Sequence, residues 1–228
     1  MGPAGLRIVV FGGTGLAGRG VVRACLDDPR VVELRAVVRR PLDVDDPRLR
    51  QVHCDDFSDL SPVAEAFDGI DAVLYCLGVS ASQIDGEAAY RVITYDYALA
   101  AGRTTLARSP GAVLHFISGS GTNAQSRMMW ARVKGETEQA LRALGLGGVV
   151  CWRPGMITAD GIPPGLPWFY RMGHRLIRPL RWARSLSVHH EDIGRAMLQL
   201  IAEDQREGTL NNREIRDAAD RYRAAHAG

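Results

Sequence analysis

A glycine-rich turn follows directly on a hydrophobic run near the start of this chain. The run, Leu6–Phe11, is nearly continuous in apolar residues, which is typical of a strand covered on both faces. The turn reads Gly12-Gly13-Thr14-Gly15-Leu16-Ala17-Gly18 and leads into a helical pattern over residues 16–26. Glycine permits tight turns and close approach of other backbone. The feature predicts a strand, a tight turn and a helix in succession.

The turn also has the spacing of a dinucleotide-binding loop. Its glycines at 12, 15 and 18 form the pattern G-x-x-G-x-x-G. In such loops the pyrophosphate contacts the backbone where the helix begins, because free N–H groups and the positive end of the helix dipole attract anions. We expect the loop to bind a dinucleotide through Gly12, Thr14, Gly15, Leu16 and Gly18. The alternative is a glycine-rich turn without a ligand.

Strand-like and helix-like segments alternate along most of the chain. Strands are expected at 6–11, 31–38, 72–76, 112–117 and 148–152, and helices at 16–26, 61–67, 90–106, 129–144, 191–202 and 213–225. This alternation predicts an α/β fold with a doubly wound parallel sheet, the Rossmann fold. We expect a single NAD(P)-binding domain over residues 1–228.

A proline-rich stretch interrupts the alternation. Residues 155–187 contain four prolines and several aromatic residues. We interpret them as an inserted lid or small C-terminal substrate region. The same stretch carries a run of five arginines from Arg171 to Arg184 with no acidic residue between them. The run fits a solvated face, capture of an anionic substrate, or contact with a membrane surface or acidic partner.

Composition excludes several classes of protein. The chain has a formal net charge of +2, so no strong positive field indicates a nucleic-acid partner. No apolar stretch is long enough for a transmembrane segment, and the first ten residues lack the pattern of a signal peptide. The four cysteines are scattered, and His189-His190-Glu191-Asp192 implies no third ligand, so we expect no disulfide framework and no metal site. A cytoplasmic location fits best.

Two arginines at the end of the second strand indicate which dinucleotide is bound. An NAD site usually carries an acidic residue there for the ribose hydroxyls, whereas this chain has Arg39 and Arg40. A guanidinium matches the geometry of a 2′-phosphate. The pair favours NADP(H) over NAD(H). The alternative is two solvated arginines.

Two further turns lie where the chain should pass the cofactor. A further strand, the third along the chain, is expected directly before His53, which makes the run at 72–76 the fourth. Asp55 or Asp56, after that third strand, could accept a hydrogen bond from the adenine amino group, although an ordinary turn or capping role is equally compatible. After the fourth strand, Cys76-Leu77-Gly78 is expected to lie along the cofactor.

Taken together, these segments resemble the short-chain dehydrogenase/reductase superfamily, specifically its atypical, epimerase-like branch. The residues that carry the resemblance are Val9–Gly18, Phe116–Gly121, Val133–Glu138, Arg153-Pro154-Gly155 and Val188–Ile193. In that family a serine follows the fifth strand, a Tyr-x-x-x-Lys motif lies on the next helix, and the Arg-Pro-Gly turn borders the nicotinamide. The resemblance therefore implies that Ser118 or Ser120 polarises the substrate oxygen, that Lys134 binds the cofactor ribose, and that Arg153 and Pro154 contact the cofactor.

The resemblance fails at the family's tyrosine. Trp130 stands four residues before Lys134, and an indole N–H donates a hydrogen bond but does not titrate. Lys134 is nevertheless the only lysine of the chain. Two functions follow: an NADP(H)-dependent oxidoreductase or epimerase-type enzyme acting on a small carbonyl or hydroxyl substrate, or a catalytically silent NADP(H)-binding sensor or regulator. The resemblance also implies a homodimer through the helices after the fourth and fifth strands.

Overall fold

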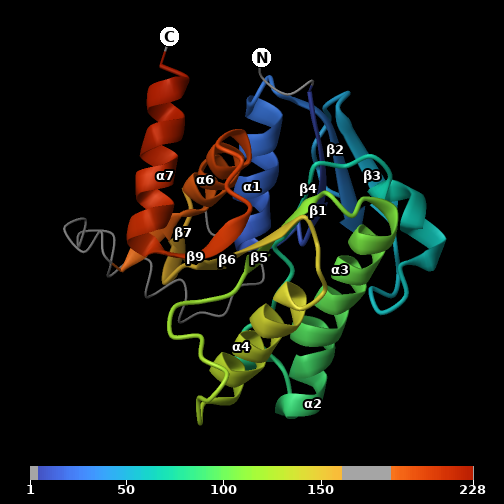
Figure 1. The fold of residues 1–228 in the computed structure, drawn as a ribbon, viewed down its shortest axis with the longest axis vertical. Coiled ribbons are helices and arrows are strands. Elements are labelled where there is room, and N and C mark those ends of the chain that lie inside the picture. Colours follow the sequence, from blue (N-terminus) through green and yellow to red (C-terminus); the bar gives the residue numbers. More distant parts are fainter. Residues whose placement is uncertain (1–4, 161–185, 228) are drawn as a thin grey trace.

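The expected strands belong to one seven-stranded sheet with further strands, in the order β3-β2-β1-β4-β5-β6-β9, and every neighbouring pair is parallel (Figure 1). The computed structural model describes residues 5–160 and 186–227. The strands are β1 (Leu6–Phe11), β2 (Val31–Val38), β3 (Leu49–His53), β4 (Ala72–Tyr75), β5 (Val113–Ile117), β6 (Gly148–Arg153) and β9 (Glu207–Asn211). Short, buried, β-branched runs suit such a sheet because both of its faces are covered. The α/β, Rossmann-type fold is confirmed.

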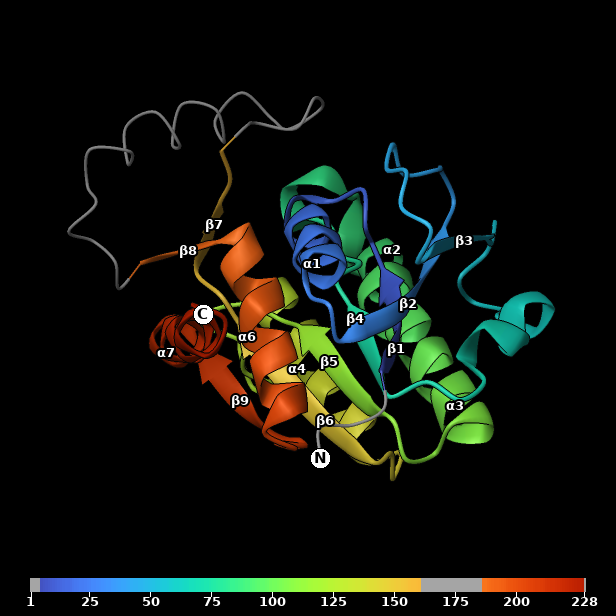
Figure 2. The same ribbon diagram turned by 90° about the horizontal axis from the view of Figure 1, so that it is seen from above.

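Helices cover both faces of the sheet (Figure 2). They are α1 (Leu16–Asp27), α2 (Gly86–Arg91), α3 (Tyr97–Arg108), α4 (Met129–Arg142), α6 (His190–Ala202) and α7 (Asn212–Ala225). One apolar core joins the sheet to α1, α6 and α7, and a second joins its other face to α3 and α4. The sheet therefore separates two cores.

Three elements differ from the sequence prediction. Residues Ser61–Phe67 form a 3₁₀ segment instead of an α-helix, with the non-helical Val63 inside it. The helix expected over 90–106 is a longer run in which α2 and α3 are joined by a π-helical turn, Val92–Asp96. Strand β9 was not expected, because its sequence Glu-Gly-Thr-Leu-Asn is mostly polar and exposed.

A second, two-stranded parallel sheet lies beside the start of α6. It consists of β7 (Met156–Thr158) and β8 (Ser187–His189), which flank most of the expected lid. Residues 161–185, which include the run Arg171 to Arg184, lie outside the described residues. Within the described ranges, no helix is long and apolar enough to cross a membrane.

Candidate functional site

The strand order changes direction between β1 and β4, which makes the carboxyl ends of these two strands the switch point of the sheet. From β1 the chain builds the sheet outward in one direction through β2 and β3, and β4 then begins the other half. In open parallel sheets, ligands bind at such a switch point. The glycine loop, Cys76, Ser118 and Arg153 all follow strands that end at this edge.

Two glycines of the loop are required by close backbone contacts. Gly12 has φ +74°, and a Cβ there would lie 2.6 Å from the backbone nitrogen of Leu77 and 2.7 Å from the carbonyl oxygen of Cys76. A Cβ on Gly18 would lie 2.1 Å from the carbonyl oxygen of Gly12. The amide of Gly15 donates to that same oxygen at 2.9 Å. Absence of side chains therefore lets the loop lie against the start of α1 and the end of β4.

The first turn of α1 is open to an anion. Its N-cap, Gly15, makes no side-chain capping bond, and no acidic residue occurs in the turn. By contrast, α6 has Glu191 and Asp192 in its first turn, and α7 has a complete capping box. The amides of α1 and the positive end of its dipole are thus of the kind that suits a pyrophosphate.

Three exposed arginines follow the glycine loop and strand β2. Arg39 and Arg40 follow β2 and are exposed, and the guanidinium of Arg39 lies 5.5 Å from the ring centroid of Phe57. Arg19, which sequence reasoning missed, donates to the carbonyl oxygen of Thr14 at 3.1 Å and lines a cavity of about 580 Å³. Within the described part of the chain, none of the three arginines forms an ion pair. Arg19 directly follows Gly18, and this position in the sequence could have identified it as a candidate.

The two aspartates after β3 are used differently. The Asp56 carboxylate accepts from the amide and hydroxyl of Ser58 at 2.8 and 2.7 Å, which lowers the pKa of Asp56. Asp55 is exposed, with its carboxylate 3.5 Å from Nε2 of His53. Asp56 therefore stabilises a turn, and Asp55 is the more accessible acceptor for an adenine amino group.

A serine, a threonine and the single lysine meet between β5 and α4. The Lys134 ammonium donates to the backbone oxygen of Ser118 at 2.5 Å. The buried Ser118 hydroxyl is 2.9 Å from that of Thr122, a partner that sequence reasoning missed. Ser120 is exposed, and its amide donates to the Pro154 carbonyl at 2.9 Å. Of the two candidate serines, Ser118 is the one beside Lys134.

Trp130 lies one helical turn before Lys134 and covers the same loop. A Cβ built on Gly121 would be 3.5 Å from Cη2 of the indole, and one on Gly119 would be 3.9 Å from its Cζ3. A Cβ on Gly119 would also lie 3.6 Å from Nζ of Lys134. The indole and the ammonium thus face one loop, and the indole supplies no titratable proton there.

Burial tunes the ionisable groups at this edge of the sheet. Desolvation lowers the pKa of Lys134 from its usual 10.5 to about 8, although the charge of Glu138 opposes this shift. Burial raises the pKa of the Cys76 thiol far above its usual value. Cys76 therefore stays a neutral thiol that packs beside Gly12, and Lys134 is partly deprotonated near neutral pH.

The guanidinium of Arg153 is held by a buried carboxylate. It donates to both oxygens of Glu138, at 2.9 and 2.6 Å, and Glu138 is 1% exposed. This pairing fixes the end of β6 against α4. The Arg153 side chain is therefore engaged away from the expected cofactor contact. The backbone of Arg153 and Pro154 lies against the loop after β5, where the Pro154 carbonyl oxygen accepts from the Ser120 amide.

Of the two histidines at the start of α6, His190 contacts the dinucleotide loop. Nδ1 of His190 lies 3.1 Å from the carbonyl oxygen of Leu16, and Nε2 of His189 lies 3.6 Å from Asp160. Across residues 5–160 and 186–227, no three His, Cys, Asp or Glu side chains are grouped to hold a metal ion.

Strand order and glycine loop together define a NAD(P)-binding Rossmann domain. Residues 12–204 match the model of the NAD(P)H-binding family, and the chain belongs to that family.

Similar proteins agree with this assignment. The rat protein HTATIP2 is 27% identical over 197 residues, which cover 84% of this chain and 79% of that protein. The mitochondrial protein FMP52 of Candida albicans is 23% identical over 154 residues, covering 66% of this chain and 67% of that protein. Among solved structures, MoeE5 in complex with UDP-glucose and NAD has a TM-score of 0.68 at 18% identity, covering 90% of this chain and 75% of that one. The dTDP-glucose 4,6-dehydratase DesIV from Streptomyces venezuelae, with NAD bound, has a TM-score of 0.69 at 18% identity, covering 98% and 82%.

Proposed function

We propose that this protein binds NADP(H) at the carboxyl edge of its sheet and uses it as an oxidoreductase or epimerase-type enzyme on a small carbonyl or hydroxyl compound. The observation that carries the proposal is the bond from the Lys134 ammonium to the Ser118 carbonyl, at the same sheet edge as the open first turn of α1. The groups suited to bind the nucleotide phosphates and the polar groups suited to the reaction thus lie at the same edge of the sheet.

Each part of the dinucleotide has matching residues. The amides of the loop from Gly12 to Gly18 suit the pyrophosphate, and Lys134 suits the ribose hydroxyls of the nicotinamide half. Arg39 and Arg40 after β2, and Arg19 on α1, suit a 2′-phosphate because their charges are unpaired within the described residues. When bound, the nicotinamide supplies a hydride donor or acceptor.

The proton of the reaction needs a group other than tyrosine. Lys134 has a pKa of about 8, close enough to neutral pH to give and regain a proton. Ser118 can donate a hydrogen bond to a substrate oxygen while its own hydroxyl accepts from Thr122. In reduction of a carbonyl, Lys134 would give its proton to the oxygen and regain one from water, while a bound nicotinamide would supply the hydride.

A catalytically silent NADP(H) sensor is the second candidate. It is favoured by Trp130, whose indole covers the loop where the family's phenol is expected. It is also favoured by the Ser118–Thr122 bond, because a hydroxyl engaged with a neighbour is less available to substrate. Cofactor binding is common to both candidates.

Nucleotide titration tests the shared premise. We expect Arg39→Ala combined with Arg40→Ala to weaken NADPH binding at least about tenfold, since a charge-assisted hydrogen bond contributes about 1.5–3 kcal/mol. NADH binding should be unchanged. Arg50→Ala, at an exposed position on β3, is the matched control. Equal losses for both nucleotides would remove the preference for NADP(H), and failure of the unmodified protein to bind either nucleotide would refute the proposal.

Turnover separates the two candidates. NADPH oxidation is followed with a panel of small ketones and aldehydes for the unmodified protein, Lys134→Met and Trp130→Tyr. Turnover that is lost in Lys134→Met supports the enzyme. Turnover that appears only in Trp130→Tyr supports the sensor, because that variant restores a titratable phenol one helical turn from Lys134.

We also propose a cytoplasmic location and a homodimer, each supported only by the sequence patterns given above. Light scattering of the purified protein tests the dimer, and imaging of a tagged chain tests the location.

A further inference from the structure

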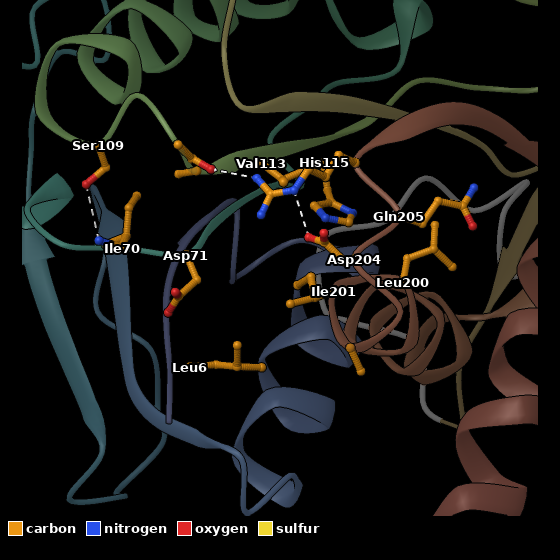
Figure 3. Close-up of a pocket in the computed structure, with 14 residues that line it drawn as sticks. Leu6, Ile70, Asp71, Ser109, Val113, His115, Leu200, Ile201, Asp204 and Gln205 are labelled. Carbon is orange, nitrogen blue, oxygen red and sulfur yellow. Dashed lines mark hydrogen bonds and ion pairs between the residues drawn. The ribbon is translucent and has the colours of Figure 1, made fainter. Parts of the chain in front are cut away.

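A second cavity lies at the opposite edge of the sheet. Its volume is about 570 Å³, within the range of small-molecule sites. It is lined by the first residues of β1 and β5, by Ile70 and Asp71 just before β4, and by the C-terminal end of α6 with the turn that follows (Figure 3). Val113 begins β5 here, whereas Ser118 follows the other end of that strand, roughly 17 Å away for an extended chain.

One buried donor in this cavity has no partner. His115 on β5 is fully buried and lines the cavity, and its Nε2 has no hydrogen-bond partner. Trp152 donates its indole N–H to Nδ1 of His115 at 3.1 Å, with the two rings stacked at 5.7 Å. Since an indole only donates, Nδ1 is an acceptor and the proton of the neutral ring is on Nε2. Burial lowers the pKa of His115 to about 3, so the ring stays neutral. An unpaired buried N–H costs about 1–3 kcal/mol, which an acceptor would recover.

The remaining lining restricts the kind of acceptor. Part of the lining is apolar, with Leu200, Ile201 and Val113 among its residues (Figure 3). At the rim, Arg206 is held by Asp204 at 2.7 Å and by the carbonyl oxygen of Gly111 at 3.0 Å. Asp71, across the rim, accepts from the amide of Arg7 and forms no ion pair within the described residues. The rim is therefore negative on balance and disfavours an anion.

We propose that this cavity is a second binding site, for a small neutral molecule with an apolar body and one oxygen acceptor that takes the Nε2–H of His115. The site is independent of the dinucleotide, because it lies at the amino edge of the sheet. A cavity of this size holds more than the single water that would satisfy one N–H.

Three probes of similar shape test the ligand class: cyclohexanone, cyclohexylammonium and cyclohexanecarboxylate. In protein labelled with ¹⁵N-histidine, we expect cyclohexanone to shift the His115 Nε2 resonance saturably, with a dissociation constant in the roughly millimolar range for so few atoms. The ammonium offers no acceptor and the carboxylate is charged, so both should bind at least about tenfold more weakly. Equal binding of all three, or no saturable shift with cyclohexanone, would overturn the proposal.

Variants locate the binding. Ala202→Trp, at an exposed rim position, should block cyclohexanone while leaving His115 in place. Ala224→Trp, at an exposed position on α7, is the matched control and should bind normally. His115→Phe should lose the preference for the ketone if it folds, and Ala202→Trp serves the test if it does not. A single ordered water on Nε2 that cyclohexanone fails to displace would also overturn the proposal.

Discussion

At the scale of single residues, the dinucleotide loop depends on the missing side chain of Gly18. Gly18→Ala would place a Cβ 2.1 Å from the carbonyl oxygen of Gly12, so the loop must move away from α1. We expect NADPH affinity to fall at least about tenfold and the protein to lose about 1–3 kcal/mol of stability. Nucleotide titration and thermal unfolding measure the two effects. Gly111→Ala, which meets open space, is the control, and an unchanged NADPH affinity in Gly18→Ala would contradict this account of the loop.

Local motifs made some site residues predictable and others not. The glycines, Arg39 and Lys134 could be placed because each has a fixed position relative to a strand or helix. Thr122 could not be assigned to Ser118, since its role depends on how the loop after β5 folds back. The same holds for Arg153, whose guanidinium is held by Glu138 on another element.

At the scale of elements, the contact between α4 and β6 depends on the ion pair of Arg153 and Glu138. Arg153→Met would leave the Glu138 carboxylate buried, with the Arg142 guanidinium 3.6 Å away. Breaking a buried pair typically costs about 3–5 kcal/mol. We expect urea unfolding to show a decrease of this size in the free energy of unfolding. Arg213→Ala removes the exposed Arg213–Asp217 pair and should cost less than about 1 kcal/mol. Similar losses for the two variants would show that the Arg153–Glu138 pair contributes little.

Helices and strands could be predicted from the sequence wherever apolar residues form a continuous run or recur with a clear period. The runs at β1, β2 and β4 are continuous and buried, and α6 has a clear apolar face. Strand β9 has one buried residue, Leu210, and its conformation is fixed by pairing with β6. Such an edge strand is specified by tertiary contact, which local periodicity does not record.

At the scale of the whole molecule, stability should fall in acid because of His115. Its folded-state pKa of about 3 lies below the usual 6.5, so between these values the unfolded chain binds a proton that the folded chain does not. The stabilisation is present above pH 6.5 and is lost as the pH falls towards 3, by up to about 1.4 kcal/mol per pH unit for one proton. Urea unfolding from pH 7 to 4 measures this slope.

Two variants assign the slope to its source. His115→Phe should show a shallower dependence on pH than the unmodified protein, whatever its absolute stability. His53→Asn, at an exposed position, should leave the slope unchanged. A slope in His115→Phe equal to that of the unmodified protein would assign the acid sensitivity to other groups.

The single lysine also gives this chain an unusual reactivity towards reagents that modify amines. Because every other basic residue is an arginine or a histidine, Lys134 is the only side chain that bears a primary amine. A reagent that acylates side-chain amines has one target, and a lysine-specific protease has one cleavage site in the unfolded chain. With its pKa near 8, that amine is nucleophilic in ordinary buffers. The protein thus carries a built-in labelling handle at the point where cofactor and substrate are proposed to meet.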